Sequence, residues 1–426
     1  MKRIAIVSAA LPPLDCGEAM STYFTALKLA ESGVDVHVVT TRRRVVTNVP
    51  GATIHAEMER WSWTEIPRLV RCLRRLEPDG VLLVYMAAMY ECHPMITFLP
   101  SILRRVLPAT RIVTRFEHVS GAADPTDALW PTRLGWLATL AFVGSRQADS
   151  RLGTLVRDSD AVIALCGQHQ AMLRELFPAL AGKISIVPPP ANFAVAADPT
   201  GVHRRRGRER VGARPSDVVV GYMGYLYPNK GIEDLLRAVA ASTRRSDLRL
   251  IFLGGRIGAP GSEFFEHYGR MQELAERLGL AERVTWSGSF AHDDDDVLPS
   301  YFHAVDFWVL PFVSGAHLNN SSLTSLMTHG RAIVTTRGKV AEDVLVDGEN
   351  VLLVPPGDPR ALAGAIDRLA ADPVLRESLA GGALRLGRER LSWATAIERT
   401  LETLLGASLR LHVVFLFFVS LRGAAR

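Results

Sequence analysis

The residues of this chain that are best suited to bind a charged ligand are small, neutral and polar. They lie in the stretch LPFVSGAHLNNSSLTSLMTHGRAIVTT, residues 310–336, where a loop leads into a short predicted helix. The residues at the start of this helix are Asn319, Asn320, Ser321 and Ser322. No carboxylate stands among them, and free N–H groups at a helix start bind anions. The stretch predicts a diphosphate pocket, with an ordinary capped helix as the alternative.

A positive side chain is expected near this helix start, at the end of another strand of the same predicted domain. The strand VVVGYMG runs into YLYPNKGIEDLLRAV, which places Gly224 at the end of the strand and Lys230 at the start of the next helix. Lysine is rare here, with five in 426 residues. A lysine at this place could reach a phosphate, helped by the positive end of the helix. A surface lysine beside a capping glycine is the alternative.

The elements around these residues form two series in which strands alternate with helical periods. The first series contains RIAIVSAA, VDVHVVTT, GVLLVYM, TRIVTRFEH, AVIALC and ISIVPPP, and the second contains DVVVGYMG, LRLIFLGG, RVTWSG, AVDFWVLP, RAIVTT and NVLLVPP. Short, continuous apolar strands suit parallel sheets that are covered on both faces. The sequence therefore predicts two doubly wound α/β domains, with ligand sites at the carboxyl ends of the strands and a cleft where the domains face one another.

The length agrees with this division, because 426 residues are too many for one ordinary core. We expect a first domain at 1–195, a basic linker at 196–216, a second domain at 217–390, and a closing helix with an apolar basic tail at 391–426. The linker carries RRRGRER. This run is either a solvated charged face or a surface that attracts acidic lipid or an acidic polymer. Nucleic acid is not expected, because no aromatic residues interleave the arginines.

Composition and cysteine spacing indicate a folded protein of a reducing compartment. Hydrophobic residues make up 48% of the chain, charged residues 22%, and the net charge is +5. The four cysteines form no C-x-x-C pair, so their spacing suggests neither a zinc site nor a disulfide framework. The acidic run His292–Asp296 fits the first turn of a helix better than a metal site. No metal or other cofactor is expected. A cytoplasmic location is expected.

The two ends of the chain bear on membrane contact. The start MKRIAIVSAALPP is interrupted by two prolines and is interpreted as a core strand rather than a signal peptide. The end LRLHVVFLFFVSLRGAAR has about ten apolar residues between arginines, too few to span a bilayer. This tail either lies on a membrane surface, at the inner face, or packs on the first domain.

Over nearly its whole length the chain resembles the retaining GT-B glycosyltransferases of the large family called family 4. The resemblance rests on the order of GYLYPNKG, LIFLGG, VTWSGSF, the loop before HGRAIVTT, VDGENVLLVPPGDPRALAGAIDRLAADPVLRESL and RLSWATAIERTLETLL. It implies a nucleotide-sugar donor on the second domain and an acceptor on the first. Transfer would proceed with retention and without a metal, because positive side chains and helix N-termini neutralise the leaving diphosphate.

The resemblance also implies further site residues. Gly17 would approach the donor phosphates or the acceptor, Glu117 and His118 would stand at the catalytic edge of the first domain, and Gly288 would line the nucleotide pocket. Tyr85 and Tyr90 would line the acceptor side. At the matching positions of two glutamates found in many members, this chain has His317 and Ser325, and Tyr225 replaces an arginine.

We therefore expect a glycosyltransferase that moves a sugar from a UDP- or GDP-sugar to a hydroxyl of a glycan or lipid-linked acceptor, as in polysaccharide biosynthesis. Two alternatives stay open from the sequence. One is a catalytically inactive GT-B paralogue that acts as a nucleotide-binding or scaffold protein. The other is an epimerase or phosphorylase-like enzyme of the same architecture.

Overall fold

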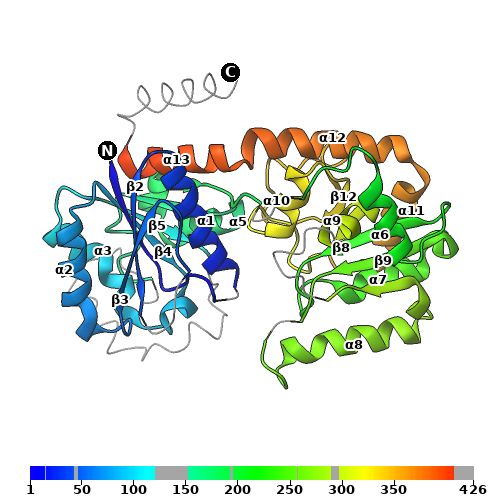
Figure 1. The fold of residues 1–426 in the computed structure, drawn as a ribbon, viewed down its shortest axis with the longest axis horizontal. Helices are drawn as coiled ribbons and strands as arrows, with labels where there is room; N and C mark the ends of the chain where they lie inside the picture. The colour runs from blue at the N-terminus through cyan, green and yellow to red at the C-terminus, as the bar shows by residue number, and fades with distance from the viewer. Residues whose placement is uncertain are drawn as a thin grey trace. The chain divides into compact units, whose positions relative to one another are not determined.

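The computed structural model describes residues 1–14, 16–42, 47–119, 152–191, 195–256, 258–288 and 297–406. It divides into two compact units (Figure 1). Unit 1 runs from Met1 to Pro189 and takes up the chain again from Trp393 onward, whereas unit 2 is Pro190–Ser392. Each unit contains one parallel sheet, as the alternation of strands and helices predicts.

Unit 1 is built on a seven-stranded sheet of order β3-β2-β1-β4-β5-β6-β7. All neighbouring strands of this sheet are parallel, and the order reverses between β1 and β4. The strands are β1 (Arg3–Val7), β2 (Asp35–Thr41), β3 (Ala52–Met58), β4 (Gly80–Tyr85), β5 (Arg111–Phe116), β6 (Ala161–Ala164) and β7 (Ile184–Ile186). The described α-helices of unit 1 are α1 (Gly17–Glu31), α2 (Ile66–Leu76), α3 (Leu99–Val106), α5 (Gly167–Leu176) and α13 (Trp393–Leu405).

Unit 2 is built on a six-stranded sheet of order β10-β9-β8-β11-β12-β13, again with parallel neighbours. Its order reverses between β8 and β11. The strands are β8 (Val218–Met223), β9 (Leu248–Leu253), β10 (Val284–Trp286), β11 (Phe307–Leu310), β12 (Ile333–Thr336) and β13 (Leu352–Val354). The described α-helices of unit 2 are α6 (Val202–Arg210), α7 (Ile232–Ala241), α8 (Glu263–Arg277), α9 (Val297–Ala304), α10 (Ser321–Thr328), α11 (Pro359–Ala371) and α12 (Pro373–Arg390).

Strand β3 is an addition to the strands expected from the sequence. It forms the edge of the first sheet and pairs with β2 alone, in parallel. Its residues ATIHAEM are mostly half-buried or exposed. An edge strand of this kind lacks the continuous apolar run by which the other strands were recognised, so the pattern could not reveal it.

The segment 196–216, expected as a basic linker, is instead built into unit 2. It contains α6, which packs against α9. The Arg204 guanidinium donates to Asp306 Oδ1, and Arg208 Nη1 lies 3.2 Å from Asp306 Oδ2. Gly207 faces Ser300 so closely that a Cβ there would overlap the Ser300 carbonyl. Two arginines of the basic run are thus paired with the carboxylate of Asp306 within unit 2. Counting the charges of the run does not reveal this pairing.

The last described helix, α13, belongs to unit 1 although it follows unit 2 in the chain (Figure 1). It packs against β4, β5 and α1. Its buried side chains Ile397, Leu401 and Leu404 join a core that includes Ile4 and Leu82. Trp393, the first residue of α13, lies with its ring centroid 5.9 Å from that of Phe24 on α1.

Candidate functional site

The N-terminus of α10 is the element of unit 2 at which the sequence predicts an anion site. Asn320 stands at the N-cap position, but its side chain does not cap the helix. Asn320 Oδ1 instead accepts a hydrogen bond from the His317 N–H at 2.9 Å. The first turn of α10 also contains no acidic residue. The N–H groups of this turn, which lack intrahelical partners, are therefore not covered by the helix's own cap.

This arrangement differs from that of other helices in the same unit. Ser262 caps α8, Asp358 caps α11 and Asp372 caps α12, each with its side-chain oxygen. The start of α7 carries Glu233 and Asp234. The expected help for Lys230 from the positive end of α7 is consequently weakened, because that end already has its own carboxylates. The N-terminus of α10 has neither a cap nor an acid.

Lys230 supplies a positive charge beside the loop that follows β11. Its Nζ lies 5.0 Å from the ring centroid of Tyr227 and 5.0 Å from that of Phe312. Within the described chain this ammonium makes no salt bridge. Two aromatic rings attract a cation through their faces without neutralising it. The charge is thus held in place and stays available to an anion.

Gly231 fixes the loop that carries Lys230. Its φ is +70°, and a Cβ at this position would overlap the carbonyl oxygen of Pro311. The Val313 N–H donates to the Asn229 carbonyl at 3.1 Å, a second link between the same two loops. Only glycine combines a left-handed φ with such close backbone contact. This residue therefore brings the end of β8 onto the end of β11.

Three glycines line the carboxyl ends of β8, β9 and β10. They are Gly224, Gly254 and Gly288, and all three have positive φ. A Cβ on Gly254 would overlap the Gly224 carbonyl, and Gly254 forms an isolated bridge with Gly288. A Cβ on Gly224 would lie 4.0 Å from Ser322 Oγ on α10. The glycines leave this edge without side chains, so a ligand could approach the backbone closely.

Of these, Gly254 is a site residue that the sequence interpretation did not single out. The signal was present in LIFLGG, where a glycine pair directly follows a buried strand. Gly288 lies on the same edge, where it forms the bridge with Gly254. The structure thus brings together Gly224, Gly288 and the start of α10, with Lys230 on the loop after β8.

The two positions that replace the family's glutamates have different surroundings. His317 is half-buried, and its Nε2 lies 3.4 Å from Asn320 Nδ2. Ser325 lies one turn into α10 and is 1% exposed. The neighbouring Leu318 N–H donates to the buried Glu342 carboxylate at 3.2 Å. His317 is therefore the less buried of the two, and Glu342 is a loop-fixing residue that the sequence interpretation missed.

In unit 1, Glu117 lies at the end of β5 in a buried ion pair. Its Oε1 accepts from Arg115 Nε at 2.8 Å and from Ser21 Oγ at 3.3 Å, and both charged side chains are 7% exposed. Arg115 Nη1 also donates to Thr25 Oγ1 on α1. The geometry gives Glu117 a part in joining β5 to α1.

The other expected residues of unit 1 lie on the same edge of its sheet. His118 is exposed, and its ring lies edge-to-face with that of His169 at 5.6 Å. Gly17 is the exposed first residue of α1, and a Cβ there would meet nothing within 4 Å. Tyr85 and Tyr90 are buried, with Tyr90 donating to the Val84 carbonyl. The expectation that these tyrosines line an acceptor site is wrong, because the apolar face of the sheet covers them.

Two further expectations concern parts of the chain that the structure does not describe. The acidic run His292–Asp296 and the apolar tail after Ser408 both lie outside the described residues. Among the helices that are described, none combines the length and hydropathy needed to cross a membrane.

Comparison with known proteins finds a family model that covers these strand ends of unit 2. Residues 217–372 match the family model described as Glycosyl transferases group 1. That range contains Gly224, Lys230, Gly254 and the start of α10. The chain carries a group 1 glycosyl transferase domain on a GT-B fold.

The GT-B fold extends over both units. Sucrose-phosphate synthase from Thermosynechococcus elongatus superposes with a TM-score of 0.68 at 17% identity and full coverage of both chains. The Anabaena protein HepE, solved in complex with UDP and glucose, superposes with a TM-score of 0.67 at 16% identity, covering 95% of this chain and 99% of that one. These likenesses establish the two Rossmann-like domains of GT-B proteins.

A D-inositol 3-phosphate glycosyltransferase from Acidothermus cellulolyticus is 30% identical over 251 residues. The match takes in 57% of this chain and 52% of that relative. The chain therefore spans about half the length of this curated relative.

Proposed function

We propose that this protein transfers a sugar from a nucleoside-diphosphate sugar, a UDP- or GDP-sugar, to a hydroxyl of a glycan or lipid-linked acceptor. The observation that carries the proposal is the pairing of an uncapped, acid-free α10 N-terminus with an ammonium that has no carboxylate partner among the described residues. A diphosphate is the leaving group that such an edge stabilises. The nucleotide-sugar chemistry is supported by the UDP bound to the Anabaena neighbour and by the name of the Acidothermus relative.

In this proposal the donor diphosphate lies at the first turn of α10, with its negative charge balanced by Lys230. Gly224 and Gly254 let the phosphates approach the strand ends, and Gly288 borders the nucleotide. His317 faces the donor sugar. Departure of the diphosphate is helped by fixed positive charge, so the reaction needs no metal for this step.

We further propose that the reaction retains the anomeric configuration and takes place in the cytoplasm, with the acceptor on unit 1. In this proposal His118, an exposed polar residue just after β5, meets the acceptor hydroxyl. Contact of the tail after Ser408 with the inner face of a membrane would suit a lipid-linked acceptor. Analysis of the anomeric configuration of the product by NMR tests retention directly.

Calorimetric titration of UDP and GDP tests the donor site. Replacing Lys230 by Ala removes one charged contact to phosphate, which corresponds to about 1.5–3 kcal/mol of binding free energy. Affinity should fall roughly tenfold to a hundredfold. Lys2→Ala, which removes an exposed lysine at the start of unit 1, serves as the control and should bind as the parent does.

Equal affinity of the Lys230→Ala variant and the parent would contradict the proposed phosphate contact. The same titrations in the presence of a chelator test whether donor binding needs a metal. Turnover of a labelled panel of UDP- and GDP-sugars distinguishes an enzyme from a protein that only binds the nucleotide.

A further inference from the structure

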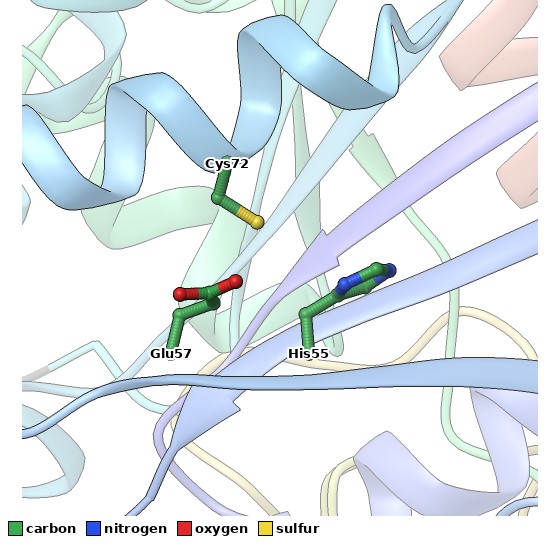
Figure 2. Close-up of side chains that lie close together, drawn as sticks. All are labelled: His55, Glu57 and Cys72. Carbon is green, nitrogen blue, oxygen red and sulfur yellow. The ribbon is translucent and has the colours of Figure 1, made fainter.

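We propose that His55, Glu57 and Cys72 form a binding site for a borderline-soft divalent cation such as Zn²⁺ at the edge of the first sheet. In the described part of the chain these three side chains each offer one ligand atom, and the three atoms lie within 4.8 Å of one another. Figure 2 shows the Cys72 thiol pointing down between the Glu57 carboxylate and the His55 ring. The site lies in unit 1 and is independent of the proposed donor site.

Strand β3 and helix α2 hold these ligands. His55 and Glu57 are two residues apart on β3, so their side chains leave the same face of the strand. Helix α2 covers this face and presents Cys72 from its buried side, beside Leu69 and Leu73. The packing of α2 on β3 therefore brings the three ligands together.

A chain of contacts behind His55 orients its ring. His37 Nδ1 lies 2.9 Å from His55 Nε2, and His37 Nε2 lies 3.1 Å from Asp35 Oδ1. Asp35 is fixed in turn by Arg3 Nε at 2.7 Å, which lowers the pKa of that carboxyl. Metal-binding histidines are commonly supported by a carboxylate in this way.

These contacts also determine which nitrogen of His55 is free to bind an ion. With both rings neutral, the Asp35 carboxylate 3.1 Å from His37 Nε2 favours the tautomer of His37 that carries its proton on Nε2. His37 Nδ1 is then an acceptor, so His55 Nε2 must carry a proton and donate it. That leaves a lone pair on His55 Nδ1. A neutral imidazole with one free nitrogen is the form in which histidine binds a metal.

The mixture of donor atoms selects the class of cation. One nitrogen, one carboxylate oxygen and one thiol sulfur match the ligands of Zn²⁺, whereas Mg²⁺ and Ca²⁺ take oxygen ligands. In a tetrahedral zinc site, ligand atoms stand about 3.3–3.8 Å apart, as follows from metal–ligand distances of about 2.0–2.3 Å. Small side-chain rotations would bring the three atoms to that separation. Three protein ligands leave one position for water.

Arg75 provides the positive charge at this cluster. Its Nη2 lies 2.8 Å from Glu57 Oε1, and its side chain is 66% exposed. Burial and the nearby Glu57 raise the pKa of the Cys72 thiol, and the hydrogen bond with Arg75 opposes this. Because it reaches the cluster from solvent, Arg75 can swing away when a metal ion binds. Arg75 is thus expected to compete with the ion.

Cobalt(II) titration of the untagged full-length protein tests the site, because a thiolate bound to Co²⁺ gives a charge-transfer band in the near ultraviolet. We expect this band at one Co²⁺ per chain, displaced by Zn²⁺. Cys72→Ala should abolish it and His55→Gln should weaken binding at least tenfold. Cys166→Ala, which removes another buried thiol of unit 1, is the matched control and should leave the band unchanged.

Three variants that leave all three ligands in place sharpen the test. Arg75→Met should tighten Co²⁺ binding about threefold to tenfold, since it removes a competing charge, whereas Arg74→Met on the same helix should have no effect. His37→Ala should weaken binding about tenfold to a hundredfold. Circular dichroism confirms that each variant is folded.

The proposal is overturned if Co²⁺ gives no thiolate band with the parent protein. It is equally overturned if Cys72→Ala and His55→Gln, both folded, bind Co²⁺ as tightly as the parent. An Arg75→Met variant that binds Co²⁺ more weakly would contradict the competition between Arg75 and the ion. None of these measurements involves a nucleotide, so failure here leaves the proposed glycosyl transfer untouched.

Discussion

Lys230 and Gly231 are neighbours with different tasks in the same loop. Lys230 supplies the charge, and two aromatic rings hold its ammonium. Gly231 supplies the geometry, because its left-handed backbone lies directly against Pro311. The sequence pointed to Lys230 through the rarity of lysine, whereas Gly231 was seen only as a cap. Its close contact depends on a residue about eighty positions away and could not be predicted from local spacing.

Gly231→Ala should therefore damage both the fold of unit 2 and donor binding. A side chain at positive φ costs about 1–2 kcal/mol, and overlap with the Pro311 carbonyl adds about 1–3 kcal/mol. We expect the free energy of unfolding to fall by about 2–5 kcal/mol, measured by urea denaturation. UDP and GDP affinity should fall with it, because Lys230 is displaced from the end of β11.

Gly357→Ala is the matched control for this prediction. Its φ of +68° is nearly the same, but nothing lies within 4 Å of a Cβ there. This variant should carry the cost of positive φ alone, about 1–2 kcal/mol. If the two variants are destabilised equally, the contact between Gly231 and Pro311 has no energetic weight and Lys230 is positioned in another way.

At the scale of elements, the start of α10 was predicted correctly, whereas the hydrogen bond that Asn320 makes there was not. Asn320 was predicted as a cap, and it occupies the cap position. Its side chain turns back to the His317 N–H instead. The residue type allows both bonds, and the choice depends on the path of the preceding loop. That loop is held by Glu342, which lies on a different segment.

A carboxylate placed in the first turn of α10 should stabilise the helix and block the anion site at once. Ser322→Glu adds a negative charge at the positive end of the helix, worth about 0.3–1 kcal/mol of stability. The same charge repels a diphosphate and competes for the N–H groups. We expect a small rise in the urea midpoint and at least a tenfold loss of UDP or GDP affinity by calorimetry.

Val374→Glu provides the comparison, since it adds the same charge to the first turn of α12. That turn has no acidic residue, and Val374 is 75% exposed. It should gain similar stability and keep full affinity for the nucleotide. A Ser322→Glu variant that binds UDP and GDP as well as the parent would remove the N-terminus of α10 from the donor site.

The same scale explains why the cluster His55, Glu57 and Cys72 could not be found from spacing. A sequence search for metal sites looks for close pairs such as C-x-x-C. Here the ligands come from an edge strand that the apolar pattern did not identify and from a helix that covers it. Only the packing of α2 on β3 brings Cys72 to the other two residues.

At the scale of the whole molecule, the positions of the strands along the chain were the most predictable property. Buried parallel strands are short, continuous apolar runs, and all six strands of unit 2 were recognised in this way. Strand β3 and helix α6 were not, because neither has a strongly apolar sequence. Their places depend on partners distant in the chain, such as Asp306 for the arginines of α6.

Unit 1 is built from two separate segments of the chain. This organisation predicts which unit each core substitution affects. Leu404 on α13 and Leu379 on α12 are both 0% exposed. Leu404 belongs to the core that contains Ile4 and Leu82, whereas Leu379 lies within unit 2. Replacing either leucine by Ala removes buried methyl groups and should cost about 2–5 kcal/mol.

Hydrogen exchange followed by mass spectrometry of peptides distinguishes the two effects. Leu404→Ala should speed exchange in β1, β4 and β5, although these strands lie about 290 to 400 residues earlier in the chain, because α13 packs on their sheet. Leu379→Ala should speed exchange in unit 2 and leave those strands protected. If Leu404→Ala instead loosens α13 alone, the helix is an appendage and unit 1 is complete without it. If both variants raise exchange throughout the chain, the two units unfold as one cooperative body, and the division at Pro189 and Trp393 describes geometry without describing stability.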